Sequence, residues 1–311
     1  MSSRKSKRAV VFGGSGFLGS YVADALTEEE FDVTIFDINE SEYLKDGQHM
    51  VTGDILDSTK VQKIVNESNI VFHFAGIADI NEANSRPLDA VRYNILGTTN
   101  ILDACVSAKI SRFIFASTVY VYSEHGGFYR STKQACELLI ENYQKTYDLS
   151  FTILRFGSLY GRRANDFNWI HQIIKQALKE GKIQREGDGE DIREYVHVKD
   201  AAQACVDLLD DKYRNEYLII SGSQIIKVKE LLRMINEIMD NKLKIEYFDA
   251  HIEGHYELTP YTFRPRMARK YSSRTTIDLG QGLLDTIYDV YKKLKNSENK
   301  KPIITLPDGE I

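Results

Sequence analysis

Short apolar runs alternate with longer segments of helical spacing through the first half of the chain. Runs that are apolar along their whole length are typical of strands buried on both faces, and strands that alternate with helices form right-handed βαβ units. We predict strands at 8–12, 32–36, 49–52, 70–74, 112–116, 151–155 and 216–220, and helices at 17–28, 58–68, 88–108, 129–147 and 199–211. The pattern predicts an α/β fold with a doubly wound parallel sheet of the Rossmann type.

The regular alternation weakens after Phe156, where helical spacing mixes with glycine, proline and charged loops. Within this part we predict helices at about 166–180, 228–240 and 282–295. We expect a main domain of 1–156 plus about 196–221, a smaller discontinuous α/β lobe of 157–195 and 222–295, and a tail of 296–311. Because ligands of open α/β sheets bind beyond the carboxyl ends of the strands, we expect the smaller lobe to bind the substrate at that edge.

The composition is that of a globular protein, with 42% hydrophobic and 27% charged residues among 311. No apolar run reaches the roughly 20 residues that a membrane span needs. The basic segment Met1–Arg8 leads directly into an apolar run that is too short for the core of a signal peptide. We therefore expect a cytoplasmic protein with no membrane partner.

Charge and cysteine usage narrow the classes of partner. The net charge of −5 disfavours nucleic acid, because a phosphate-binding surface needs a basic stripe. Cys105, Cys136 and Cys205 lie far apart in helical apolar patterns, without a CxxC pair. We interpret them as buried small hydrophobic residues, and we expect neither a disulfide nor a bound metal.

A glycine-rich turn, Gly13-Gly14-Ser15-Gly16-Phe17-Leu18-Gly19, joins the first predicted strand to the first helix. The first two glycines permit a tight turn, Gly16 lets the backbone approach a pyrophosphate, and Gly19 lets the helix pack on the strand. The amino terminus of the helix offers N–H groups and the positive end of its dipole to phosphates. A flexible turn is the alternative for the motif alone, but its place between strand and helix predicts dinucleotide binding.

Residues at the next strand ends extend this site. Asp37 ends the second strand, where a carboxylate accepts hydrogen bonds from both ribose hydroxyls of NAD and repels the 2′-phosphate of NADP. No arginine follows in Ile38-Asn39-Glu40. Asp54, before Ile55, is placed for an adenine amino group, and Phe74-Ala75-Gly76 lets the chain run beside the cofactor. A turn cap is the alternative for Asp37, but together these residues predict NAD as the cofactor.

Tyr129 and Lys133 are spaced i and i+4, so they project from one helix face. A tyrosine titrates near ~10, but a nearby ammonium and a positive nicotinamide favour its phenolate. Tyr129 is then a base for a sugar hydroxyl while hydride leaves the same carbon. Thr118, after the fifth strand, would also hydrogen-bond to the sugar hydroxyl and so orient the substrate. An amphipathic helix face is the alternative for this spacing.

These motifs resemble the extended short-chain dehydrogenase/reductase family, in its nucleotide-sugar epimerase and dehydratase branch. The resemblance reaches to about residue 290. It rests on GGSGFLG at 13–19, Asp37, Gly53-Asp54-Ile55, Ala75-Gly76, Asn94-Ile95-Leu96-Gly97-Thr98, Ser117-Thr118, Tyr129 with Lys133, and Arg193-Glu194-Tyr195-Val196-His197-Val198 with Asp200.

The resemblance implies a role for each matching residue. The catalytic residues would be Thr118, Tyr129 and Lys133, with Thr118 selected over Ser117 because it precedes the tyrosine of Val121-Tyr122-Ser123 by four positions. Asn94 would support the active-site backbone, with an ordinary polar helix residue as the alternative. The implied cofactor-binding residues are Gly13, Ser15, Gly16, Phe17, Leu18, Asp37, Ile38, Asp54, Ile55, Phe74, Ala75, Gly76, Asn94, Ser117, Tyr129 and Lys133. The family also implies a homodimer through the helices at 88–108 and 129–147.

Three departures from the family pattern matter. Val119 and Tyr120 occupy the positions where dehydratases of this branch carry Asp-Glu, which disfavours loss of water. The stretch from Tyr122 to Tyr129 is short, so we expect a trimmed loop that admits a larger sugar. Ser158 replaces the asparagine that usually contacts the phosphate end of the substrate, so that contact must differ.

Substrate recognition needs local positive charge in an acidic protein. Arg193 matches a family arginine that grips a diphosphate, and Arg264 or Arg266 would supply a second clamp. Surface arginines on a charged lobe are the alternative. We interpret His197 as structural and Asp200 as the cap of the following helix.

We therefore expect an NAD-dependent enzyme that oxidises C4 of a nucleotide-diphosphate sugar to a 4-keto sugar, without dehydration. The alternative is a 4-epimerase that re-reduces the ketone. A non-catalytic regulator that senses NAD(H) and a reductase of non-sugar carbonyls are further alternatives. The overall resemblance implies a role in capsule or surface-polysaccharide assembly, with a GDP-linked heptose as one candidate substrate.

Overall fold

The computed structural model describes residues 7–248, 269–271, 276–296, 302 and 304. They divide into two compact units. The described residues of the first unit lie within Met1–Phe156, Ala201–Ile220 and Pro260–Tyr271, and those of the second within Gly157–Asp200, Ser221–Thr259 and Ser272–Ile311. Each unit has its own hydrophobic core.

The first unit is built on an eight-stranded sheet in the order β13-β10-β6-β5-β4-β1-β2-β3, and all of its pairings are parallel. The strands are β1 (Arg8–Phe12), β2 (Asp32–Asp37), β3 (Gln48–Thr52), β4 (Ile70–His73), β5 (Arg112–Thr118), β6 (Phe151–Phe156), β10 (Glu216–Ile220) and β13 (Arg269–Tyr271). This confirms the predicted α/β fold. The order in which the chain adds strands to the sheet reverses between β1 and β4, and open sheets bind ligands at such a point. The edge strand β13 was not predicted from the sequence.

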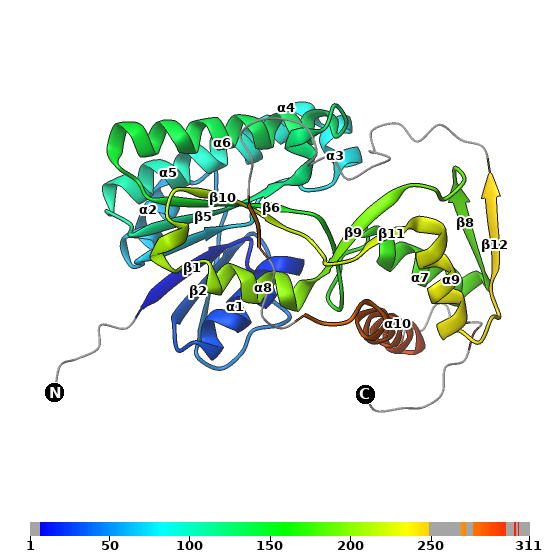
Figure 1. The fold of residues 1–311 in the computed structure, drawn as a ribbon. Coiled ribbons are helices and arrows are strands. Elements are labelled where there is room, and N and C mark those ends of the chain that lie inside the picture. The colour runs from blue at the N-terminus through cyan, green and yellow to red at the C-terminus, as the bar shows by residue number, and fades with distance from the viewer. Residues whose placement is uncertain (1–6, 249–268, 272–275, 297–301, 303, 305–311) are drawn as a thin grey trace. The chain divides into compact units, whose positions relative to one another are not determined.

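Helices cover both faces of this sheet, with α2, α5 and α6 on one face and α1 and α8 on the other (Figure 1). The helices are α1 (Phe17–Glu28), α2 (Ser58–Asn66), α3 (Ile80–Ser85), α4 (Pro87–Ala90), α5 (Gly97–Ser107), α6 (Gly127–Tyr147) and α8 (Val198–Asp207), with 3₁₀ turns η2 (Val119–Tyr122) and η3 (Asp211–Tyr213). The core between the sheet and α2, α5 and α6 contains Cys105 and Cys136. All three cysteines are buried, as predicted.

The single helix predicted at 88–108 is instead three consecutive pieces. A π-helical segment, η1 (Val91–Leu96), separates α4 from α5. Apolar spacing did not reveal it, because the wider turn depends on local hydrogen bonding. Such turns often occur at functional sites.

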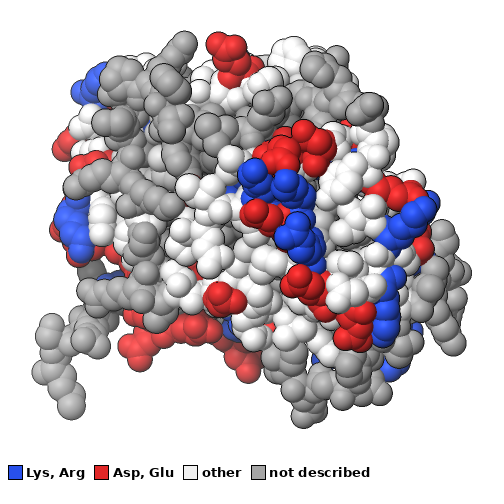
Figure 2. All heavy atoms as spheres, turned by 45° about the vertical axis from the view of Figure 1, so that its right-hand side comes forward, with Lys and Arg blue, Asp and Glu red and all other residues white. Residues whose placement is uncertain are grey.

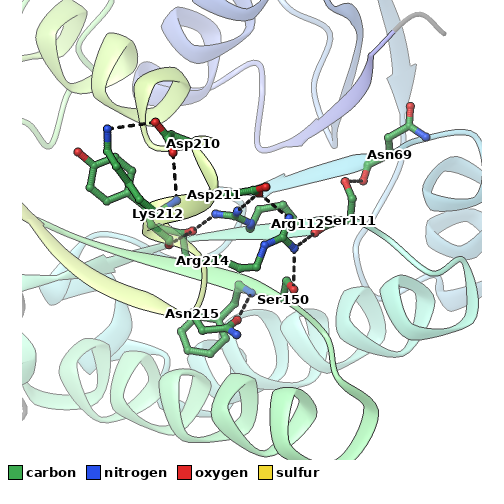
Figure 3. Close-up of polar contacts among 12 residues, drawn as sticks. Asn69, Ser111, Arg112, Ser150, Asp210, Asp211, Lys212, Arg214 and Asn215 are labelled. Atoms are coloured by element: carbon green, nitrogen blue, oxygen red, sulfur yellow. Dashed lines mark hydrogen bonds and ion pairs between the residues drawn. The ribbon is translucent and has the colours of Figure 1, made fainter.

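The amino ends of β5 and β6 carry a group of charged residues (Figure 3). Arg112 donates to Thr152 at 2.9 Å and to Asp211 at 3.3 Å. Arg214 donates to the carbonyl of Ser111 at 3.0 Å and to Ser150 Oγ at 2.8 Å. These contacts attach η3 to the edge of the sheet opposite the strand ends where ligands bind, so we interpret the group as structural.

The described residues of the second unit form two small sheets and three helices. One sheet pairs β7 (Ser158–Tyr160), β9 (Ile192–His197) and β11 (Ile225–Lys227), and the other pairs β8 (Lys182–Glu186) with β12 (Lys244–Phe248). The helices are α7 (Trp169–Glu180), α9 (Val228–Ile238) and α10 (Leu279–Lys295), and their apolar faces form one core. The three helices were predicted from the sequence, whereas the short strands were not.

The surface carries charges of both signs. In the face drawn in Figure 2, the coloured Lys and Arg side chains lie beside Asp and Glu side chains. In the second unit, for example, Lys227 and Lys229 both contact Glu190. No helix among the described residues has both the length and the apolar character to cross a membrane.

Candidate active site

The glycine turn after β1 is closely packed against the chain that follows β4. Gly13 has a φ of +78°, and a Cβ there would lie 2.6 Å from the backbone nitrogen of Ala75. A Cβ on Gly19 would lie 2.1 Å from the carbonyl oxygen of Gly13. Both positions therefore require glycine, and a substitution would displace the turn from the sheet.

The amino terminus of α1 fits a pyrophosphate. The helix begins at Phe17 after Gly16, and in the described structure no side chain caps it and no acidic residue occupies its first turn. A Cβ on Gly16 would lie 3.2 Å from the carbonyl oxygen of Gly13, so the glycine keeps the backbone open to an approaching group. Backbone N–H groups and the helix dipole together favour phosphate at such a terminus. The residues present therefore fit a dinucleotide.

Asp37 lies beside this turn at the end of β2. Its Oδ2 accepts the Ser15 N–H at 3.1 Å, and its Oδ1 accepts the Asn39 N–H at 3.1 Å. Ser15 Oγ donates to the carbonyl of Asn39 at 2.8 Å. The carboxylate is thus fixed between the glycine turn and the loop after β2, with the exposed Ile38 next to it. This is the position that recognition of an adenosine ribose requires.

The residues predicted after β3 and β4 differ in their surroundings. Asp54 accepts the Leu56 N–H at 2.9 Å, which closes a local turn. Ile55 is buried, and its side chain packs against Gly97 of α5. Gly76 has a φ of +136°, and a Cβ there would lie 2.5 Å from Asn94 Oδ1. Because β4, β1, β2 and β3 are parallel neighbours, all four strand ends gather at one edge.

Asn94, in the π-helical segment, joins this edge to α6. Its Oδ1 accepts the Ile77 N–H at 2.8 Å, and its Nδ2 donates to the Ile77 carbonyl at 3.1 Å and to Thr132 Oγ1 at 2.9 Å. Thr132 lies on α6 immediately before Lys133. The amide, which is buried at 2% exposure, therefore holds the backbone of Ile77 beside Thr132 of α6.

Thr118, Tyr129 and Lys133 come together at the carboxyl end of β5. Burial raises the pKa of Tyr129 to about 12, and a hydrogen bond with Thr118 opposes this rise. Lys133 Nζ donates to the carbonyl of Ala116 at 2.8 Å and lies 6.0 Å from the centre of the Tyr129 ring. Burial lowers the pKa of Lys133. The arrangement can exchange a proton through the phenol beside a buried ammonium.

Ser117, one residue earlier, contacts a residue that sequence reasoning missed. Its hydroxyl donates to Glu137 Oε1 at 2.5 Å, and Glu137 forms an ion pair with Arg155 at 2.6 Å. Glu137 follows Lys133 by one helical turn, and Arg155 lies on β6 opposite Ser117. The i, i+4 spacing from Lys133 was the only signal in the sequence, since the partners lie far apart along the chain.

Two of the predicted substrate residues, Ser158 and Arg193, belong to the second unit. Ser158 begins β7 and pairs with Tyr195 of β9, the strand that carries Arg193. Arg193 Nη1 donates to the carbonyl of Ile192 at 3.0 Å, and its Nη2 lies 3.9 Å from Asp191. The other two candidates, Arg264 and Arg266, lie outside the described residues.

His197 and Asp200 follow Arg193 on the same segment. Burial lowers the pKa of His197 to about 4, and the ring packs edge-on against Tyr160 at 5.2 Å. This agrees with a structural histidine. Asp200 does not cap the following helix as predicted, because α8 already begins at Val198. Its carboxylate instead accepts the Ile277 N–H at 2.9 Å.

Comparison with known proteins shows the family of this chain. The model of the NAD dependent epimerase/dehydratase family matches residues 9–219. The chain belongs to this family. The match confirms the resemblance to the extended short-chain dehydrogenases of the nucleotide-sugar branch, and NAD is the cofactor of the family.

Relatives within the family act on several nucleotide sugars. The chain is 29% identical to the UDP-N-acetyl-alpha-D-glucosaminuronate decarboxylase of Bacillus cytotoxicus, over 77% of this chain and 82% of the relative. It is also 29% identical to a protein of Methanocaldococcus jannaschii assigned as a UDP-glucose 4-epimerase, over 88% and 95%. The UDP-glucose 4-epimerase of Thermotoga maritima, solved with UDP-glucose, shares the fold with a TM-score of 0.82 at 24% identity, covering 92% of this chain and 99% of that one. The chain is thus an enzyme of a nucleotide-sugar family.

Proposed function

We propose that this enzyme oxidises C4 of a nucleotide-diphosphate sugar and releases the 4-keto sugar nucleotide without dehydration. The observation that carries the proposal is the grouping of Thr118, Tyr129 and Lys133 at the carboxyl edge of the sheet, in the same unit as the glycine turn and Asp37. Family membership supplies the class of substrate and the cofactor.

The proposed roles follow from the chemistry of the three side chains. Tyr129 takes the proton of the sugar C4 hydroxyl, and Thr118, hydrogen-bonded to the phenol, orients that hydroxyl. Lys133 contributes a positive charge that favours the phenolate and so lowers the barrier to proton removal. NAD, when bound, supplies the hydride acceptor and a further positive charge. Gly13, Gly16 and Asp37 would hold its pyrophosphate and adenosine ribose.

Dehydration is disfavoured by the residues that follow Thr118. Val119 is a buried apolar residue, and Tyr120 offers a phenol in place of a carboxylic acid. The Tyr120 ring lies 6.5 Å from the Tyr129 ring in an edge-on arrangement, with its backbone N–H 3.2 Å from Thr118 Oγ1. A phenol is a much weaker acid than a carboxylic acid, so expulsion of a sugar hydroxyl lacks its proton donor here.

A 4-epimerase is the second candidate function. It is favoured by the similarity to a protein assigned as a UDP-glucose 4-epimerase along nearly the whole of both chains. The same three residues would act, and the ketone would be re-reduced on its other face after the sugar rotates. Decarboxylation of a uronic acid would also begin from a C4 ketone, because that ketone is β to the C6 carboxylate.

The proposal extends to recognition and assembly. Arg193 would bind the diphosphate, with Ser158 on the neighbouring strand and Arg264 or Arg266 as further contacts. Leu96, Leu138 and Tyr147 are large apolar side chains exposed on η1 and α6, which supports a homodimer through α5 and α6. We further propose a cytoplasmic role in capsule or surface-polysaccharide assembly. Analytical ultracentrifugation at micromolar concentration tests the dimer.

A screen of activated sugars tests the function. Purified enzyme with NAD is mixed with UDP-, GDP- and dTDP-linked hexoses and heptoses, including GDP-linked heptose. Absorbance at 340 nm reports net oxidation, and chromatography of the products separates a 4-keto sugar from a 4-epimer. A rise at 340 nm with a 4-keto product supports the dehydrogenase, whereas a C4-inverted sugar without net absorbance change supports the epimerase. No turnover of any substrate contradicts both.

A further inference from the structure

A buried ion pair joins α6, which carries Tyr129 and Lys133, to β6, the strand next to β5. Glu137 and Arg155 are joined by two hydrogen bonds, Nε to Oε1 at 3.0 Å and Nη2 to Oε2 at 2.6 Å. Their side chains are only 8% and 5% exposed. Ser117 Oγ adds a third donor to Oε1 at 2.5 Å. The carboxylate of Glu137 is therefore held on both oxygens.

Arg155 extends these contacts to two more elements. Its Nη1 donates to the hydroxyl of Tyr122, at the end of η2. The guanidinium carbon also lies 4.6 Å from the centre of the Tyr122 ring and 4.8 Å from that of Tyr217 on β10. One side chain of β6 thus contacts η2, α6 and β10.

The ion pair is close in sequence or strand register to the proposed catalytic residues. Ser117 immediately precedes Thr118, and Ser117 and Arg155 are register partners on β5 and β6. Glu137 follows Lys133 by four residues on α6, so the two side chains lie on the same helix face. The ion pair therefore fixes the helix that carries Tyr129 and Lys133 against the strand end that carries Thr118.

Stability alone does not explain the pair. Removing two charges from water costs about as much as their attraction returns, so apolar residues of similar volume are often equally stabilising. A buried ion pair instead has one defined geometry, which is useful where neighbouring side chains must be placed accurately. The pair joins the elements that carry the proposed catalytic residues, which suits this purpose.

Glu137 also matters for the charge of Lys133. The titratable groups around this ammonium come from β4 and α6, since β5 contributes Phe115 and the carbonyl of Ala116. Burial and, to a smaller extent, the positive charge of Lys133 lower the pKa of His73 on β4 to about 3, so this imidazole is neutral. Burial raises the pKa of Tyr129 to about 12, so the resting phenol is neutral.

The remaining groups are on α6. Burial lowers the pKa of Lys133, and Cys136 and Glu137 oppose this change. The Cys136 thiol has its own pKa raised by burial, so it carries no charge near neutral pH. Among the described groups that act on Lys133, Glu137 is therefore the one that supplies negative charge.

We propose that the Glu137–Arg155 pair is a positioning device for catalysis, which keeps Lys133 charged while preventing Glu137 from binding it directly. The proposal rests on the oxidation by Tyr129 and Lys133 proposed above. Arg155 and Ser117 fill three of the about four acceptor positions of the carboxylate, and Lys133 Nζ donates to the carbonyl of Ala116. The lysine thus retains donors for a ligand while the buried anion acts on it through space.

The test compares Glu137→Gln with Glu141→Gln. Both remove one carboxylate from α6, but Glu141 lies a further turn from Lys133 and contacts Tyr217 and Lys145. The dependence of kcat/KM on pH is measured for wild type and both variants. Glu137→Gln is expected to move the alkaline limb to lower pH by about one unit, because the ammonium loses its neighbouring anion. Glu141→Gln is expected to leave that limb unchanged.

A second readout is independent of turnover. The protein is labelled with 13C at lysine Cε and studied without cofactor. The resonance of Lys133 is the one that disappears in Lys133→Arg, and its chemical shift is followed against pH. Its midpoint should fall in Glu137→Gln and not in Glu141→Gln. Equal shifts in the two variants, or none in either, overturn this inference. A wild type that turns over no nucleotide sugar overturns the proposed function instead, while the resonance still reports on the ion pair.

Discussion

At the residue scale, burial disfavours the charged forms of Tyr129 and Lys133, the proposed catalytic pair. It raises the pKa of Tyr129 to about 12 and lowers that of Lys133, so each charged form is disfavoured by its surroundings alone. The phenolate of Tyr129 and the ammonium of Lys133 stabilise each other when both are present. The hydrogen bond with Thr118 also lowers the pKa of Tyr129. The site is thus arranged to create the base when ligands complete it, rather than to hold a phenolate at rest.

Asp37 is expected to determine the choice of cofactor. Its carboxylate is fixed by Ser15 and Asn39, so it cannot turn away from a 2′-phosphate. Asp37→Ser should weaken NAD binding by about 10-fold, because hydrogen bonds to a charged group are lost. It should also narrow the preference of the enzyme for NAD over NADP. Titration of both cofactors by fluorescence quenching measures the two dissociation constants. An unchanged ratio would show that Asp37 only closes its turn.

At the element scale, the sequence predicted the strands and helices whose apolar pattern is continuous, such as β1, α1, β6 and α10. It also indicated the residues that stand at strand ends, because strand ends in a parallel sheet share one edge. The π-helical segment around Asn94 could not be predicted, since it depends on hydrogen bonds to Ile77 and Thr132 that form only in the folded chain. The same holds for the pairing of Glu137 with Arg155.

The packing of α1 on β1 depends on Gly19. A Cβ there would lie 2.1 Å from the Gly13 carbonyl oxygen, in contact with backbone that has no room to move. Gly19→Ala should therefore lower the melting temperature and weaken NAD binding by at least 10-fold, because the turn that receives the pyrophosphate is displaced. Differential scanning fluorimetry and cofactor titration measure both effects.

Gly181→Ala provides the control for this substitution. Gly181 also has restricted backbone, with a φ of +67°, but a Cβ there meets no atom within 4 Å. It should cost only about 1 kcal/mol of stability and leave cofactor binding unchanged. Similar effects of the two substitutions on NAD binding would contradict the close packing described for the turn.

At the scale of the whole molecule, His73 and His197, two of the three buried histidines among the described residues, predict sensitivity to acid. Burial lowers the pKa of His73 from 6.5 to about 3 and that of His197 to about 4. Between these values and about 6.5 the unfolded chain binds protons that the folded chain does not, so stability is present above pH 6.5 and is lost as the pH falls. Each histidine should contribute about 1.4 kcal/mol per pH unit within its window.

Urea unfolding at several pH values between 7 and 4 measures this loss. His73→Gln should flatten the dependence of the unfolding free energy on pH, whereas His125→Gln, at an exposed position, should not. A wild-type stability that stays constant down to pH 4 would mean that these rings are accessible to protons in the folded state.

The fate of the C4 hydrogen tests the central claim most directly. Enzyme in excess is mixed with NAD and a nucleotide sugar deuterated at C4. The reaction is quenched within one turnover, and the cofactor is then analysed by mass spectrometry. The account predicts that wild type transfers deuterium to the cofactor and that Tyr129→Phe, which binds NAD but lacks the base, does so at least 100-fold more slowly. Product formed with no deuterium on the cofactor, or a Tyr129→Phe variant as fast as wild type, would contradict it.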